Sequence, residues 1–134
     1  MSRLIQTWLE PFDWEFITEV NRGLCKQKNA LHKPTSDGHD PARKLWEESR
    51  SKKLHLVKAL QICRQCHRLA PFCFYNGNTF AAIARDFIAE LAPNLAADKA
   101  HILRSIAGHV VAGTATDLEE KQLEELLAEL ENVR

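Results

Sequence analysis

Three cysteines and one histidine of this 134-residue chain lie within eleven residues of each other and could together bind a metal ion. Cys63, Cys66 and His67 fall in one short string, and Cys73 follows six residues later. Thiolate sulfur and imidazole nitrogen are the ligands that zinc prefers, four of them in a tetrahedron. On a helix, however, Cys66 and His67 diverge by about 100° around the axis. Cys63 also continues an apolar stripe, and reduced cysteine is often buried. We therefore expect these cysteines to be core residues, with no metal or other cofactor.

The five residues from Cys63 to His67, Cys-Arg-Gln-Cys-His, resemble the haem-attachment motif of c-type cytochromes. The resemblance implies two thioether bonds to a haem and a histidine ligand on its iron. It covers five residues, and the one methionine that could be a second axial ligand is Met1. A thioredoxin-like redox pair lies at a helix N-terminus, whereas this pair falls near the end of its predicted helix. A metal or haem protein that uses Cys63, Cys66 and His67 is one functional hypothesis.

A second group of residues with possible chemistry is a run of cations. Residues 22–68 contain twelve basic and four acidic residues, a net charge of +8. Clustered cations neutralise phosphates, and affinity for nucleic acid grows with each phosphate neutralised. The chain as a whole is neutral with a pI near 7, and it has no helix-turn-helix signature or aromatic stacking platform. Nucleic-acid binding through a basic 43–68 helix is a second hypothesis, and its candidate phosphate-binding residues are Arg43, Lys44, Arg50, Lys52 and Lys53.

The C-terminal segment has the opposite charge and an apolar stripe. Residues 116–134 contain two basic and seven acidic residues, a net charge of −5. Four apolar residues recur there at steps of three and four, as on one face of a helix, and a helix this short needs a surface to pack on. We expect the stripe to contact the protein's own bundle, a second copy or another protein, with its acidic side near the basic segment. The candidate partner-binding residues are Leu123, Leu126, Leu130 and Val133.

The sequence offers little support for catalysis. The five glycines are isolated, so no phosphate-binding glycine loop is present. His101, Ser105 and His109 share a predicted helix face, but the strand-turn-helix that presents a nucleophilic serine is missing. We expect no enzymatic activity.

Apolar spacing predicts helices and no sheet. Asp13, Asp40 before Pro41, Asn78 and Thr116 are expected helix N-caps, with Gly113 as a C-terminal stop. Apolar residues show no helical or strand periodicity over residues 29–40, so we expect a flexible loop there. The segment 41–69 is expected to be one long helix, or two helices broken near Ser51. The other predicted helices are 13–27, 79–91, 96–112 and a last one after Thr116.

Length and composition are those of one globular domain over residues 1–134. Hydrophobic residues make up 45% and charged residues 27% of the chain, and no apolar run approaches a membrane span. The N-terminus lacks the features of a secretory signal, so a cytoplasmic location is expected. The fold class is therefore all-α, an irregular bundle of five or six helices. The residues expected in its core are Phe80, Ile83, Phe87, Ile102, Ile106 and Val110.

The leading functional hypothesis is a non-catalytic helical module for protein–protein contacts or regulation. It depends on the polarised charge and the amphipathic C-terminal segment. The expected partner is another protein or a second copy of the chain, with nucleic acid as the alternative and no membrane.

Overall fold

The computed structural model describes residues 2–132 and confirms an all-α, irregular bundle. Over these residues it contains six α-helices, one 3-10 helix and two strands of two residues each. Their bounds are β1 Ile5–Gln6, α1 Trp14–Gln27, α2 His39–Arg50, β2 Leu54–His55, α3 Leu56–Leu69, α4 Asn76–Ile88, η1 Ala89–Asn94, α5 Ala97–Ala112 and α6 Asp117–Glu131.

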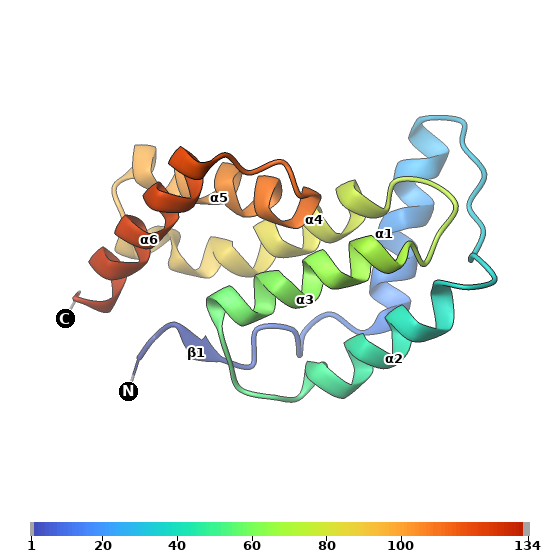
Figure 1. Ribbon diagram of the computed structural model, residues 1–134, viewed down its shortest axis with the longest axis horizontal. Coiled ribbons are helices and arrows are strands. Elements are labelled where there is room, and N and C mark those ends of the chain that lie inside the picture. Colours follow the sequence, from blue (N-terminus) through green and yellow to red (C-terminus); the bar gives the residue numbers. More distant parts are fainter. Residues whose placement is uncertain (1, 133–134) are drawn as a thin grey trace.

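The helices α3, α4 and α5 form the body of the bundle, and each packs on the other two (Figure 1). Helix α2 lies along the outer side of α3, and α1 crosses one end of the bundle against α4 and α2. Helix α6 packs on α5 at the opposite end from α1, near the N-terminal segment. The Ser2 hydroxyl donates a hydrogen bond to Glu131, which ties the two ends of the chain together.

Residues 41–69 do not form one long helix, so that expectation is wrong. The alternative of two helices broken near Ser51 is confirmed. Helix α2 ends at Arg50 and α3 begins at Leu56. Between them Leu54 pairs with Gln6 of β1, and the Leu56 N–H donates to the Leu4 carbonyl oxygen over 2.8 Å. The residues after Arg50 are polar and offer no apolar face that would hold a helix on the core.

Some of the helix ends coincide with the capping residues expected from the sequence. Asp13 caps α1 by accepting from the Phe16 N–H, and Thr116 forms a capping box with Glu119, as expected. Gly113 ends α5 with a φ of +79°, also as expected. The cap expected at Asn78 is wrong because α4 begins at Asn76.

The cap expected at Asp40 is wrong as well, because α2 begins at His39 with Gly38 before it. Pro41 is accommodated in the first turn, where the N–H that it lacks has no helical partner. Gly38 is required by close approach, since a Cβ there would lie 1.8 Å from the Leu69 carbonyl oxygen.

The connection expected to be a flexible loop at 29–40 is hydrogen-bonded to the segment after α3. The Thr35 N–H donates to the Pro71 carbonyl over 2.9 Å, and the Cys73 N–H donates to the Lys33 carbonyl over 3.0 Å. Both segments reach Asn21 of α1, whose amide donates to the Phe74 carbonyl and whose oxygen accepts from His32. The loop is thus fastened to the bundle at several points.

The expected core is largely confirmed. Phe80, Ile83, Phe87 and Ile106 are buried, Val110 is half-buried, and Ile102 is 37% exposed. The expectation for Ile102 is wrong because this residue lies at the edge between α5 and α6, where it lines a shallow groove with Leu126.

Candidate functional site

The cysteine cluster does not form a metal site in the part of the chain that the structure describes. Cys63 and Cys66 are fully buried, and the Cys66 thiol lies 3.7 Å from the Ala42 carbonyl oxygen of α2. His67 turns elsewhere and donates from Nδ1 to the Val111 carbonyl oxygen of α5 over 3.0 Å. Over residues 2–132 no three His, Cys, Asp or Glu side chains are grouped closely enough to hold a metal ion.

Burial also makes the thiols of Cys63 and Cys66 on α3 unreactive. It raises the pKa of Cys66 to about 12 and the pKa of Cys63 well above its ordinary value. Both thiols are therefore protonated at neutral pH, whereas metal binding and nucleophilic attack need the thiolate. Their placement in the core is confirmed, but the expectation that Cys73 is a core residue is wrong, because its side chain is exposed.

The apolar stripe of α6 is part of the protein's own core. Leu130 is fully buried, and Leu123 and Leu126 are each 8% exposed, while Val133 lies outside the described residues. These three leucines are partner-binding candidates only if α6 leaves the bundle.

Two acidic residues of α6 contact α5, and in the described chain none forms an ion pair with the basic segment, so the expected pairing with that segment is wrong. Glu129 forms an ion pair with Lys99 over 2.8 Å, and Glu119 lies 2.5 Å from Nδ1 of His109. The hydrogen bond from His109 lowers the pKa of Glu119. The cause is the short connection after α5, which folds α6 back onto the preceding helix.

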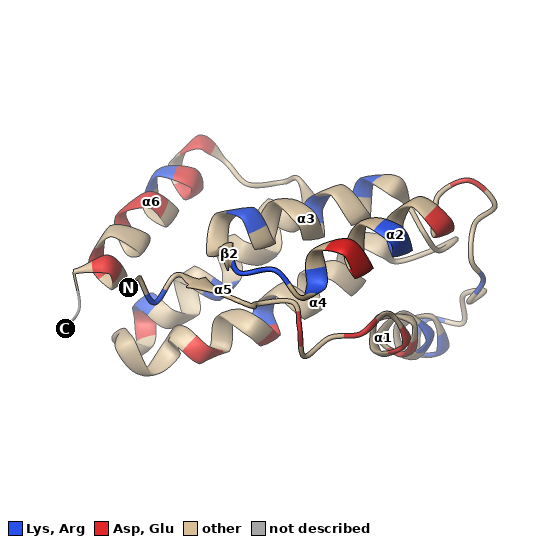
Figure 2. Ribbon diagram, turned by 90° about the horizontal axis from the view of Figure 1, so that it is seen from below, with Lys and Arg blue, Asp and Glu red and all other residues tan. Residues whose placement is uncertain are grey.

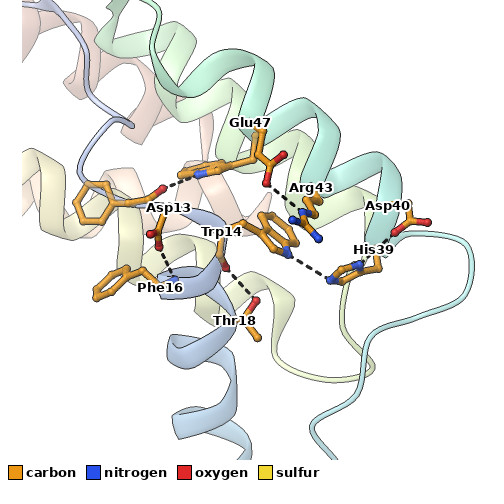
Figure 3. A network of polar contacts seen from close by, with 10 residues as sticks. Asp13, Trp14, Phe16, Thr18, His39, Asp40, Arg43 and Glu47 are labelled. Carbon is orange, nitrogen blue, oxygen red and sulfur yellow. Dashed lines mark hydrogen bonds and ion pairs between the residues drawn. The ribbon is translucent and has the colours of Figure 1, made fainter.

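Two of the five candidate phosphate-binding residues are committed to contacts within the protein. Arg43 forms an ion pair with Glu47 one turn later, over 3.0 Å (Figure 3). Arg50 donates from Nε to the Glu10 carbonyl oxygen over 2.9 Å, which fastens the N-terminal segment to the end of α2.

The other three candidates, Lys44, Lys52 and Lys53, are exposed and have no ion pair among the described residues. Ala42 near the start of α2 contacts Cys66 near the end of α3, so the two helices run antiparallel. The exposed side of α3 adds Lys58 and Arg68 to the same surface. Figure 2 shows basic positions along α2, α3 and the turn between them, whereas α6 is mostly acidic. We name this surface the cationic face; it comprises Lys44, Lys52, Lys53, Lys58 and Arg68.

The composition of the cationic face is almost wholly polar. Its acidic neighbours are Asp40, Glu47 and Glu48, which surround Lys44 on α2. Gln61 and Gln65 fill the exposed positions between the cations of α3. Among the exposed large hydrophobic residues in the described chain, Leu69 at the end of α3 is the one that borders it. Arg64 is excluded, because its guanidinium covers Gly113 at the end of α5.

One polar contact that sequence reasoning missed positions the start of α2. Nε1 of Trp14 donates to Nε2 of His39 over 3.2 Å, and the two rings meet edge to face (Figure 3). Phe72 stacks on Trp14 from the segment after α3. These residues come from three segments that are far apart in the sequence, so no local spacing could reveal the cluster.

The histidines of α5 do not assemble a catalytic group with Ser105. His101 is exposed, and His109 is paired with Glu119. Of these three residues, His109 is the one whose contact with α6 the structure shows.

Comparisons of the chain with protein-family models, curated proteins and solved structures give no match. Within the described chain, no helix combines the length and apolar character needed to cross a membrane.

Proposed function

We propose that the protein is a non-catalytic helical module that binds nucleic acid through the cationic face, by contact with backbone phosphates. The observation that supports this most strongly is the set of five exposed cations without ion pairs among the described residues, which outnumber the three carboxylates beside Lys44.

The make-up of the face favours phosphate over an acidic protein surface as the ligand. Protein interfaces are depleted in lysine at their centre and enriched in aromatic residues, methionine and arginine. The cationic face has four lysines, one arginine and no exposed large apolar residue at its centre. Lysine side chains are flexible point charges that suit phosphate contacts.

The dimensions of the face suit a strand of several phosphates. Lys58 and Arg68 are ten residues apart on α3, which corresponds to about 15 Å along the helix. One strand of a duplex presents a phosphate about every 3.4 Å of helix axis, so this distance covers about four phosphates. Lys52 and Lys53 extend the face beyond the start of α3. Such contacts position a protein on nucleic acid without reading its sequence.

The acidic helix α6 lies at the end of the bundle where α3 begins, and it favours one orientation on a polyanion (Figure 1). Glu120, Glu124, Glu125 and Glu131 are exposed there and have no basic partner in the described chain. Phosphates repel the exposed side of α6 and attract the cationic face, so the charge asymmetry orients the neutral molecule during association, with the acidic side of α6 turned away from the polyanion.

Charge reversal at one lysine tests the proposal. Binding of a fluorescein-labelled 20-base-pair DNA is measured by anisotropy at low salt for Lys52→Glu and for the control Lys121→Glu. Lys121 is an exposed lysine on α6, so the control makes the same change of charge away from the face. We expect Lys52→Glu to weaken binding at least tenfold and Lys121→Glu to leave it within twofold.

Three outcomes would overturn the proposal. The first is absence of DNA binding by the unmodified protein at low salt. The second is an equal loss of affinity in both variants. The third is displacement of the DNA by polyglutamate at the same concentration of charge as by unlabelled DNA, which would indicate an acidic protein surface as the ligand.

A further inference from the structure

We infer that a groove between the N-terminal segment and the end of α4 binds a cationic segment of a partner protein, with an arginine or lysine side chain against its acidic rim. This groove has a volume of about 560 Å³ and lies apart from the cationic face. The inference does not depend on the proposed binding of nucleic acid.

The walls of the groove are held in place by hydrogen bonds to the chain's own backbone. Nε1 of Trp8 donates to the Leu4 carbonyl over 3.0 Å, and Nε1 of Trp46 donates to the Phe12 carbonyl over 2.7 Å. Arg50 binds the Glu10 carbonyl, as described above. The segment from Leu4 to Phe12 has no regular helix, yet these contacts fix its shape before any ligand arrives, which lowers the entropic cost of binding.

The floor of the groove is a row of aromatic rings. Phe87 lies between Trp8 and Phe12, with ring centroids 5.9 Å and 6.4 Å away. Beyond the groove lining, the row continues to Phe16, which is 5.7 Å from Phe12 and 42% exposed. The three rings in the groove are buried, so the floor is rigid and offers a small apolar surface on which the aliphatic stem of an arginine or lysine can pack.

The rim of the groove is acidic. Glu10, Asp86 and Glu90 line it and are exposed, and none of them has an ion pair among the described residues. Arg50 is the one cation in the lining, so the groove carries three negative charges and one positive charge. This imbalance attracts a cationic ligand.

The positions of Asp86 and Glu90 are unfavourable for the free protein. They are four residues apart on a continuous helical path, where like charges repel each other. They also lie at the C-terminal end of α4, the negative end of the helix dipole. Arg85 does not relieve them, since its guanidinium lies against Gly108 of α5. Local rules are broken in this way where a ligand provides the compensation.

The carboxylates of Asp86 and Glu90 are therefore better suited to binding a cationic ligand than to stabilising the fold. A partner cation beside Asp86 and Glu90 would remove the repulsion between them and form ion pairs with both. A short segment with several arginines and one apolar residue matches both the rim and the floor.

The test uses a fluorescein-labelled pentapeptide, Arg-Arg-Leu-Arg-Arg, with anisotropy as the measurement. The groove variant is Asp86→Asn with Glu90→Gln, which keeps the shapes of both side chains and removes their charges. The matched control is Glu120→Gln with Glu124→Gln, a pair of exposed carboxylates with the same spacing on α6. We expect the groove variant to weaken binding at least tenfold and the control pair to change it less than twofold.

The melting temperature of the groove variant gives a second readout. Relief of the repulsion should leave the melting temperature equal to that of the unmodified protein or raise it. A lower melting temperature would show that the carboxylates support the fold, and would overturn the inference.

Three binding results would also overturn it. They are a dissociation constant for the pentapeptide weaker than 1 mM, equal weakening in the two variant pairs, and equal binding of a Glu-Glu-Leu-Glu-Glu peptide. Self-association of the unmodified protein that is abolished in the groove variant would assign the groove to a second copy instead, and would overturn the choice of partner.

Discussion

Trp14 and His39 join the first two helices by a hydrogen bond from the indole Nε1 to the imidazole Nε2, over 3.2 Å. Because Nε2 accepts this bond, the neutral imidazole carries its proton on Nδ1, which faces Asp40 at 3.4 Å. The pair holds the start of α2 on α1 and thereby places Lys44, one turn further along, at the surface.

A double-mutant cycle should show that Trp14 and His39 are coupled. Trp14→Phe removes the indole donor and His39→Ala removes its acceptor. We expect a coupling free energy of about 0.5–1.5 kcal/mol from urea unfolding of the two single variants and the double variant. Additive effects within about 0.3 kcal/mol would contradict the role given to this hydrogen bond.

Asn21 is the buried polar centre that connects α1 to two loops and α4. Its amide group donates to the Phe74 carbonyl and to Thr79 Oγ1, and its oxygen accepts from His32. Asn21→Ala removes these hydrogen bonds and leaves a cavity at a fully buried position, and it should lower the free energy of unfolding by about 2–4 kcal/mol. The exposed Asn78→Ala change in α4 is the control, with an expected effect within about 0.5 kcal/mol. Similar effects of the two changes would refute the assignment of Asn21.

The α6 leucines should be structural residues. Leu130 is fully buried and Leu118, on the same helix, is 67% exposed. Leu130→Ala should cost about 2–5 kcal/mol in urea unfolding, and Leu118→Ala should stay within about 0.5 kcal/mol. If Leu130→Ala kept full stability but lost binding to a partner, α6 would be a docking helix instead.

The four thiols should differ sharply in accessibility. In the native protein a thiol reagent should titrate Cys73 alone, since it is the one exposed cysteine, and all four thiols after denaturation. Cys73→Ser should abolish the fast reaction. Rapid reaction of two or more thiols in the native state would mean that α3 is not packed as described.

The raised pKa values of the buried thiols predict a loss of stability at alkaline pH. The folded protein keeps the thiol protons of Cys63 and Cys66, while the unfolded chain loses them above about pH 8.5. Stability is therefore full below that pH and falls as the pH rises toward 12. The urea midpoint should be lower at pH 10 than at pH 7.5, and Cys66→Ala should reduce this difference. Equal midpoints at the two pH values would contradict the burial of these thiols.

Local chemistry made much of the fold predictable. The cap at Asp13, the capping box at Thr116 and the stop at Gly113 depend on one turn of chain each, and all three are confirmed. The strands β1 and β2 have two residues each, which is too short to show a period. Their pairing joins Gln6 to Leu54, so it depends on long-range contact that local spacing does not reveal.

The candidate surfaces were predictable only in part. Cations can be counted in a sequence, but whether each is free depends on its neighbours in space, as Arg43 and Arg50 show. Cys66 and His67 are adjacent in sequence yet bond to α2 and α5 respectively. Trp8 and Phe87 both line the groove between the N-terminal segment and the end of α4, and they are brought together only by the packing of these two segments.

The salt dependence of DNA binding tests the central claim most directly. Anisotropy titrations of the labelled 20-base-pair DNA between 20 and 150 mM salt give the slope of log affinity against log salt. Neutralisation of three to five phosphates by the cationic face predicts a slope of about −2.7 to −4.5. Lys52→Ala with Lys53→Ala should make the slope less negative by about 1.8. A slope near zero, or a slope that these two changes leave unaltered, would contradict binding of nucleic acid through this face.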